Sequence, residues 1–185
     1  MDSGTFPNYS KFTIVNESAG SYIFDREDYE VFEKWNNVIT SLPDQHEINN
    51  TKISIRINRD SMDSINTLGY TQMNDNYYSP NTNINYTIKD ARIVFNKDLV
   101  ITLKNQTRNS GKSTFYYMFL HEMGHAFGIG ALFDGNNLQS LLDGTLWYTG
   151  INAVREYNYY FLDSSYDKIP IENNGGIGTE NVSLE

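Results

Sequence analysis

The sequence predicts one α+β domain with a mixed sheet, because helical and strand-like hydrophobic patterns alternate along a chain of ordinary domain length. Apolar residues recur at steps of three and four over residues 25–42, and a second helix is expected over residues 113–127, where glycines follow its last turn. Between these segments, residues 52–58 alternate apolar and polar side chains, which is typical of a half-buried strand. A length of 185 residues suits a single hydrophobic core, so we expect residues 1–185 to form one domain.

The first half of the chain is expected to supply a helix and then the strands of the sheet. An acidic start and Pro43 at the end delimit the first helix. The strand at residues 52–58 places three isoleucines on one face. Residues 59–90 are rich in Asn, Ser and Tyr and predict turns with one or two short strands. Residues 91–96 predict another strand, which residues 99–103 extend or pair with.

Two further helices are expected in the second half. Ser110 and Ser113 are both candidate N-caps of the second helix, because a serine hydroxyl can accept from the free backbone N–H groups of the first turn. Gly128 and Gly130 follow the helix and suit its left-handed C-terminal turn. Apolar and aromatic residues at helical spacing predict the third helix over residues 151–162.

Composition excludes several classes of function. Lys and Arg number 14 against 23 Asp and Glu, and the resulting charge of −9 disfavours binding to a nucleic-acid backbone. The chain contains no cysteine, which excludes disulfides, zinc ribbons and thiol catalysis without indicating a compartment. The longest apolar run is far shorter than a membrane span, and the first residues lack a secretory signal pattern. We therefore expect a soluble protein.

Residues 121–125 carry the pattern HExxH within the second predicted helix. A step of four residues turns a helix by about 400°, so His121 and His125 project from the same face and can bind one Zn²⁺ together. Glu122 is then placed to take a proton from water that zinc has made more acidic. The alternative is a chance pattern in which both histidines are surface or packing residues. The third histidine, His46, lies in a polar loop and is expected at the surface.

Three blocks of sequence resemble one family of zinc peptidases. Residues 120–130, LHEMGHAFGIG, resemble the active-site helix and glycine turn of the metzincins. Residues 147–157, WYTGINAVREY, resemble the YTG-x-x-A-x-x-x-Y segment of the leishmanolysin-like branch, and residues 169–179, IPIENNGGIGT, are similar to its IPVEN-x-GG-x-GT segment. The chain therefore resembles the leishmanolysin-like zinc metallopeptidases over residues 115–179.

The resemblance implies a zincin-like, metzincin-type catalytic domain that hydrolyses peptide bonds in a peptide or protein substrate. It implies one Zn²⁺ held by His121 and His125, with Glu122 as the general base that later protonates the leaving amine. It also implies that an extended peptide adds to the edge of the strand at residues 91–95. Tyr148 could donate a hydrogen bond to an oxyanion, or could serve only as a core or loop residue.

The chain departs from this family where the family completes its metal site. The resemblance implies a third histidine soon after the Gly-Thr pair and then a methionine turn, but no histidine follows His125 and the last methionine is Met123. The domain could continue beyond residue 185, could have lost these elements, or could use another ligand. Glu156 and Glu172 are candidates among the downstream acids, and neither is assigned. A zincin-fold binding or structural module without catalysis is therefore the alternative function.

Overall fold

The computed structural model describes residues 9–18, 23–42, 46, 49–62, 67–78, 86–130, 132, 136, 139–142, 145–160 and 167–171. The chain divides into two compact units, Met1–Gly130 and Ala131–Glu185, which are taken in turn below. Helices and a mixed sheet together confirm the predicted α+β class. That residues 1–185 form one catalytic domain stays a prediction.

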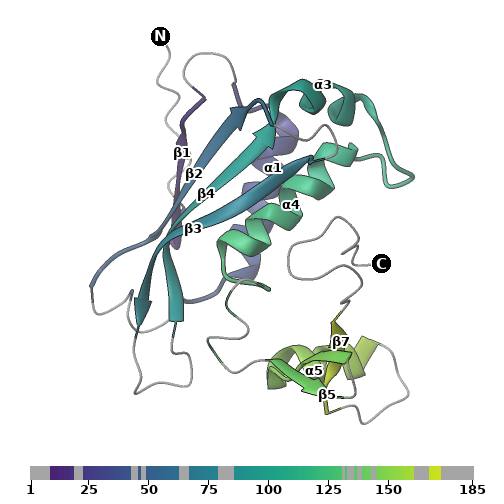
Figure 1. Ribbon diagram of the computed structural model, residues 1–185. Coiled ribbons are helices and arrows are strands. Elements are labelled where there is room, and N and C mark those ends of the chain that lie inside the picture. The colour runs from purple at the N-terminus through teal and green to yellow at the C-terminus, as the bar shows by residue number, and fades with distance from the viewer. Residues whose placement is uncertain are drawn as a thin grey trace. The chain divides into compact units, whose positions relative to one another are not determined.

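The first unit is built on a four-stranded sheet in the order β1-β2-β4-β3 (Figure 1). Strands β1 (Phe12–Asn16), β2 (Ile53–Asp60) and β4 (Tyr86–Asn96) are parallel to one another. Strand β3 (Gly69–Tyr78) is antiparallel to β4 and forms the edge of the described sheet. The sheet is therefore mixed, with its antiparallel strand at one side.

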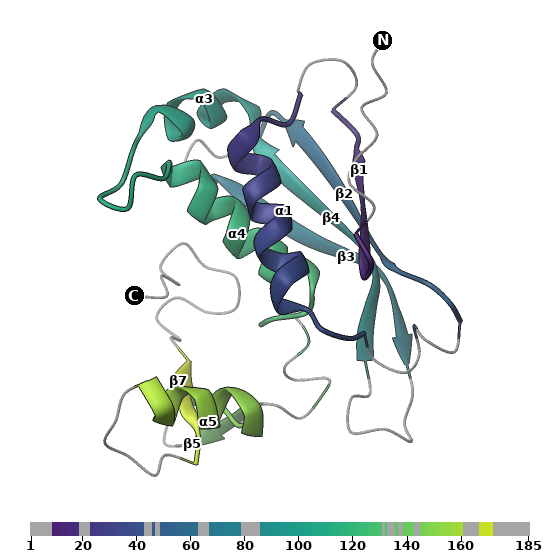
Figure 2. The same ribbon diagram turned by 180° about the vertical axis from the view of Figure 1, so that it is seen from behind.

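Helices α1 (Arg26–Val38) and α4 (Thr114–Ala126) lie on the same face of this sheet, and α3 (Lys97–Asn105) follows β4 directly (Figure 2). The alternating isoleucines of β2 point into the core, where Ile55 and Ile57 are fully buried. Phe119 of α4 joins the layers, since its ring centroid lies 4.9 Å from that of Phe95 on β4 and 5.3 Å from that of Phe32 on α1. Aromatic contacts of this kind fix α4 against the sheet.

Both ends of α4 follow from local hydrogen bonding. Ser113, one of the two predicted candidates, is the N-cap, and its hydroxyl accepts from the Tyr116 N–H at 3.0 Å. At the other end, Gly128 has a φ of 92° and its N–H donates to the His125 carbonyl. The Ile129 N–H donates to the carbonyl of Gly124, which completes a Schellman turn. The predicted glycine-terminated helix is confirmed.

The structure contradicts three expectations for this unit. Residues 99–103 belong to helix α3 and not to a strand. The region expected to hold turns with short strands contains β3, which is 10 residues long, and the start of β4. His46 is 1% exposed, because its Nε2–H donates to the Ile88 carbonyl at 2.7 Å and its ring packs edge-on against Tyr77. The prediction that His46 is a surface residue is wrong.

The second unit contains a small antiparallel sheet and one helix. Strands β5 (Gln139–Leu142) and β7 (Ile169–Ile171) both pair with β6 (Thr145–Tyr148). Helix α5 (Ile151–Tyr160) occupies most of the predicted third helix, and residues 161–162 of that prediction lie outside the described residues. Across the described parts of both units, every helix is too short or too polar to cross a lipid bilayer.

Candidate metal centre

The two histidines of the HExxH pattern meet on one side of α4. Their Nε2 atoms are 2.9 Å apart, and their ring centroids are separated by 4.5 Å with the ring planes nearly perpendicular. The i,i+4 spacing on a regular helix produces this approach, as the sequence predicts. The two nitrogens that could bind a metal therefore lie within hydrogen-bonding distance of each other.

This arrangement fits two ligands of a zinc ion. With Zn–N bonds of about 2.0–2.1 Å and tetrahedral angles, two ligand nitrogens lie about 3.3 Å apart. A separation of 2.9 Å is close enough for small ring rotations to produce that value. Burial lowers the pKa of His121, and the neighbouring His125 ring lowers it further. A lowered pKa favours the neutral imidazole, which is the form that binds a metal.

The turn after α4 determines which nitrogen of His125 is available. The carbonyl of Ile129 lies 2.7 Å from His125 Nδ1, and because a carbonyl only accepts, Nδ1 carries the proton. Nε2 then carries the lone pair, which accepts from His121 Nε2–H in this structure, and Nε2 is the atom that would bind a metal, as in many zinc sites where a backbone carbonyl orients the histidine. Gly130 lies against the same ring, since a Cβ there would be 3.3 Å from His125 Cε1. Sequence reasoning identified these residues only as a helix end.

Glu122 lies on the part of α4 that faces the edge strand. The residue is 7% exposed, and Thr71 Oγ1 on β3 donates toward its Oε2 at 2.7 Å and its backbone carbonyl at 3.0 Å. Glu122 thus directly follows His121 in sequence, and the Thr71 hydroxyl of β3 hydrogen-bonds to its side chain. Sequence reasoning missed Thr71, which lies 51 positions away in a region expected to form turns.

The strand expected to receive a peptide occupies a different place in the sheet. Residues 91–95 belong to β4, which pairs with β2 on one side and β3 on the other. Its backbone groups are already used by those two neighbours, so the prediction that its edge binds peptide is wrong. The edge strand beside α4 is β3.

The downstream candidates for a third ligand belong to the second unit. Glu156 falls within helix α5 of the second unit, and Glu172 lies outside the described residues. Tyr148 is on β6, where burial raises the pKa of its hydroxyl. Within the described ranges, no group of three or more His, Cys, Asp or Glu side chains is placed to hold a metal. A third ligand is not assigned.

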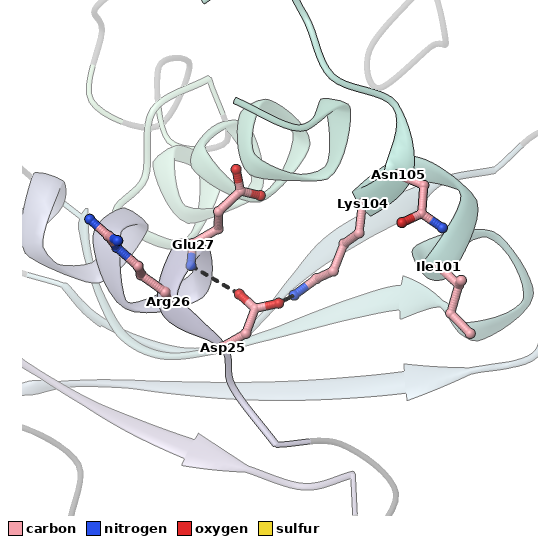
Figure 3. Close-up of a pocket in the computed structure, with 6 residues that line it drawn as sticks. All are labelled: Asp25, Arg26, Glu27, Ile101, Lys104 and Asn105. Atoms are coloured by element: carbon pink, nitrogen blue, oxygen red, sulfur yellow. Dashed lines mark hydrogen bonds and ion pairs between the residues drawn. The ribbon is translucent and has the colours of Figure 1, made fainter. Parts of the chain in front are cut away.

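One pocket of the first unit lies apart from the histidines. It has a volume of about 470 Å³ and sits where the start of α1 meets the end of α3 (Figure 3). The polar groups that line it already pair with one another: Lys104 forms an ion pair with Asp25, and Asp25 accepts a hydrogen bond from the Glu27 N–H. We therefore interpret this pocket as part of the helix packing. Its lining residues are Asp25, Arg26, Glu27, Ile101, Lys104 and Asn105.

The chain was compared with protein-family models, curated proteins and solved structures, and none of them matches it.

Proposed function

We propose that this protein is a zinc-dependent endopeptidase of the zincin type, related to the leishmanolysin-like enzymes. The observation that carries the proposal is the approach of His121 and His125, whose Nε2 atoms lie 2.9 Å apart, on the same helix as the buried Glu122. The HExxH pattern is thus on a helix in a unit with a mixed sheet and an antiparallel edge strand. This arrangement supports a zincin-like fold.

His121 and His125 would hold Zn²⁺ through their Nε2 atoms. When bound, zinc supplies Lewis-acid chemistry, polarising a peptide carbonyl and lowering the pKa of water. The Glu122 carboxylate accepts the proton of the attacking water and then donates it to the nitrogen of the leaving amine. A glutamine at this position keeps the size of the side chain but cannot take that proton.

The edge strand β3 supplies a place for an extended substrate. Within the described sheet β3 pairs only with β4, so its other edge presents backbone N–H and carbonyl groups. An extended peptide can pair with such an edge through main-chain hydrogen bonds. Because β3 also contacts Glu122 through Thr71, a peptide on this strand would run beside the proposed general base.

The direct test combines metal analysis with peptide cleavage. We expect about one equivalent of zinc in protein prepared without chelator, and cleavage of an unstructured peptide library. Glu122→Gln should keep its zinc and lose at least about 10²-fold in kcat/KM, because removing a general base costs this much or more. Glu30→Gln is the matched control. It makes the same chemical change on helix α1, where the Glu30 carboxylate pairs with Lys112 and Arg26.

Two results would contradict the proposal. One is a protein that takes up no zinc when it is supplied, and the other is cleavage that survives Glu122→Gln. Turnover that disappears with Glu122→Gln would exclude the alternative of a binding module without catalysis.

A further inference from the structure

The hydroxyl of Thr71 connects the edge strand to the proposed general base. Thr71 Oγ1 lies 2.7 Å from Glu122 Oε2 and 3.0 Å from the Glu122 backbone carbonyl. A threonine hydroxyl carries one hydrogen, which both oxygens can only accept. The two distances therefore describe one donor shared between the side chain and the backbone of the same glutamate.

The sheet register explains why Thr71 reaches α4. Thr71 pairs with Ile93 across the β3–β4 ladder, and directly paired residues on antiparallel strands point to the same side. Ile93 is fully buried, so Thr71 points to the core face on which α4 packs. Figure 1 shows β3 running beside α4 along that face. The neighbouring side chain, Tyr70, is on the opposite side of the strand and is 44% exposed.

The glutamate needs such a partner to keep one orientation. Glu122 is 7% exposed, so little water is available to satisfy its carboxylate. Among the described residues, Thr71 is the only one whose side chain hydrogen-bonds to that carboxylate. A hydrogen bond from a neutral hydroxyl to a charged acceptor is stronger than a bond between neutral groups. Losing it would leave the side chain free to rotate away from a reacting water.

We propose that Thr71 is a positioning residue that holds the Glu122 carboxylate in the orientation required for proton transfer. The proposal rests on the peptidase function proposed above and deepens it. Thr71 also connects the general base to β3, the strand on which the substrate is proposed to lie. The same strand would then position both the substrate and the base. The atom responsible is the hydroxyl oxygen, which distinguishes Thr71→Ser from Thr71→Val.

The contact itself can be tested without catalysis, in metal-free protein. A double-mutant cycle compares the unfolding equilibrium constants of the wild type, Thr71→Val, Glu122→Ala and the double variant in urea. We expect a coupling of about three-fold to ten-fold in that constant, as for other residues in direct contact. Thr71→Ser should keep most of the coupling. Additive effects would show that the hydroxyl does not hold the carboxylate, and would overturn the proposal.

The positioning role is tested with zinc-loaded protein and a peptide substrate. Thr71→Val should lower kcat by about 10-fold to 100-fold, the usual cost of losing a group that orients a catalytic or ligand side chain. We expect KM to change by less than about three-fold and the zinc content to stay the same. Thr71→Ser should restore kcat to within about three-fold of the wild type. Thr13→Val, at an exposed position of β1, is the matched control and should behave as the wild type.

The outcomes separate this proposal from the function on which it rests. If the wild type cleaves and Glu122→Gln abolishes cleavage, but Thr71→Val leaves kcat unchanged, the positioning role alone is overturned. A serine variant as defective as the valine variant would also overturn it, because the hydroxyl would then not be the responsible group. If the wild type takes up no zinc and cleaves nothing, the proposed function fails, and the positioning role fails with it.

Discussion

At the scale of single residues, Gly130 controls the ring of His125. Gly130 has a φ of 77°, a conformation that residues with a side chain rarely adopt. A Cβ there would lie 3.3 Å from Cε1 and 3.4 Å from Nδ1 of His125, so the ring or the backbone would have to move. The adjacent Ile129 carbonyl fixes the proton of the same ring. The backbone conformation of Gly130 and the orientation of the His125 ring are thus coupled at this turn.

We expect Gly130→Ala to weaken zinc binding by about 10-fold, because it disturbs the hydrogen-bonded position of His125. It should also lower the free energy of unfolding by about 1–2 kcal/mol through backbone strain. Gly111→Ala is a matched control, since Gly111 has a φ of 80° but a Cβ added there would meet no atom within 4 Å. Competition with a zinc indicator and urea unfolding measure the two effects. Equal zinc affinities in both variants would contradict the link to His125.

At the scale of elements, Lys104 joins α3 to the start of α1. Its Nζ lies 3.0 Å from Asp28 and 4.9 Å from the centroid of the Phe115 ring, and it also pairs with Asp25 (Figure 3). The Asp28 side chain is fully buried. Burial raises the pKa of Asp28 even though Lys104 stabilises its charge. One lysine therefore compensates a buried carboxylate between helices.

Removing that lysine should be costly at neutral pH. We expect Lys104→Met to reduce the free energy of unfolding by about 3 kcal/mol at pH 7, because the buried Asp28 charge loses the ammonium group 3.0 Å away and keeps the Asp25 N–H and the more distant Arg59. The loss should shrink as the pH falls toward about 5, since Asp28 in the folded variant can take up a proton more readily than in the unfolded chain. Lys104→Met combined with Asp28→Leu should recover part of the stability. Urea unfolding at both pH values tests this, and a loss independent of pH would contradict it.

The elements also show where a sequence can and cannot predict this fold. Helix α4 can be predicted from its serine N-cap and from the glycines that follow it, both of which are local signals. Helix α3 is not predicted because its β-branched residues suggest a strand. In the structure, Asn96 caps the helix, and the buried Val100 and Leu103 lie three positions apart, as on one face of a helix. Strand β3 is not predicted at its full length because an edge strand with polar residues on both faces and an irregular register has no alternating pattern.

The candidate site divides in the same way. His121, Glu122 and His125 could be found from sequence because one helical turn brings them together. The Thr71–Glu122 contact joins positions 51 residues apart and depends on the pairing of β3 with β4, which no local pattern specifies. Burial of His46 depends likewise on Ile88 and Tyr77, which are distant in sequence.

At the scale of the whole molecule, the described core is concentrated in the first unit. All described buried apolar side chains except Val154 lie within Met1–Gly130. This unit also holds the four-stranded sheet and the α1–α4 contact, where Trp35 Nε1 donates to the Leu120 carbonyl at 3.2 Å. These contacts are internal to the first unit.

We expect a fragment of residues 1–130 to fold on its own, because these contacts are all internal to it. Trp35 is its only tryptophan, so the fluorescence of that residue reports on the packing of α1 against α4. Urea should unfold the fragment in one cooperative transition, with fluorescence and far-ultraviolet circular dichroism changing together. Phe119→Ala in the fragment should lower the free energy of unfolding by about 3–5 kcal/mol, because Phe119 is 1% exposed and central to the core. A gradual, non-cooperative change in the unsubstituted fragment would show that its stability depends on residues 131–185.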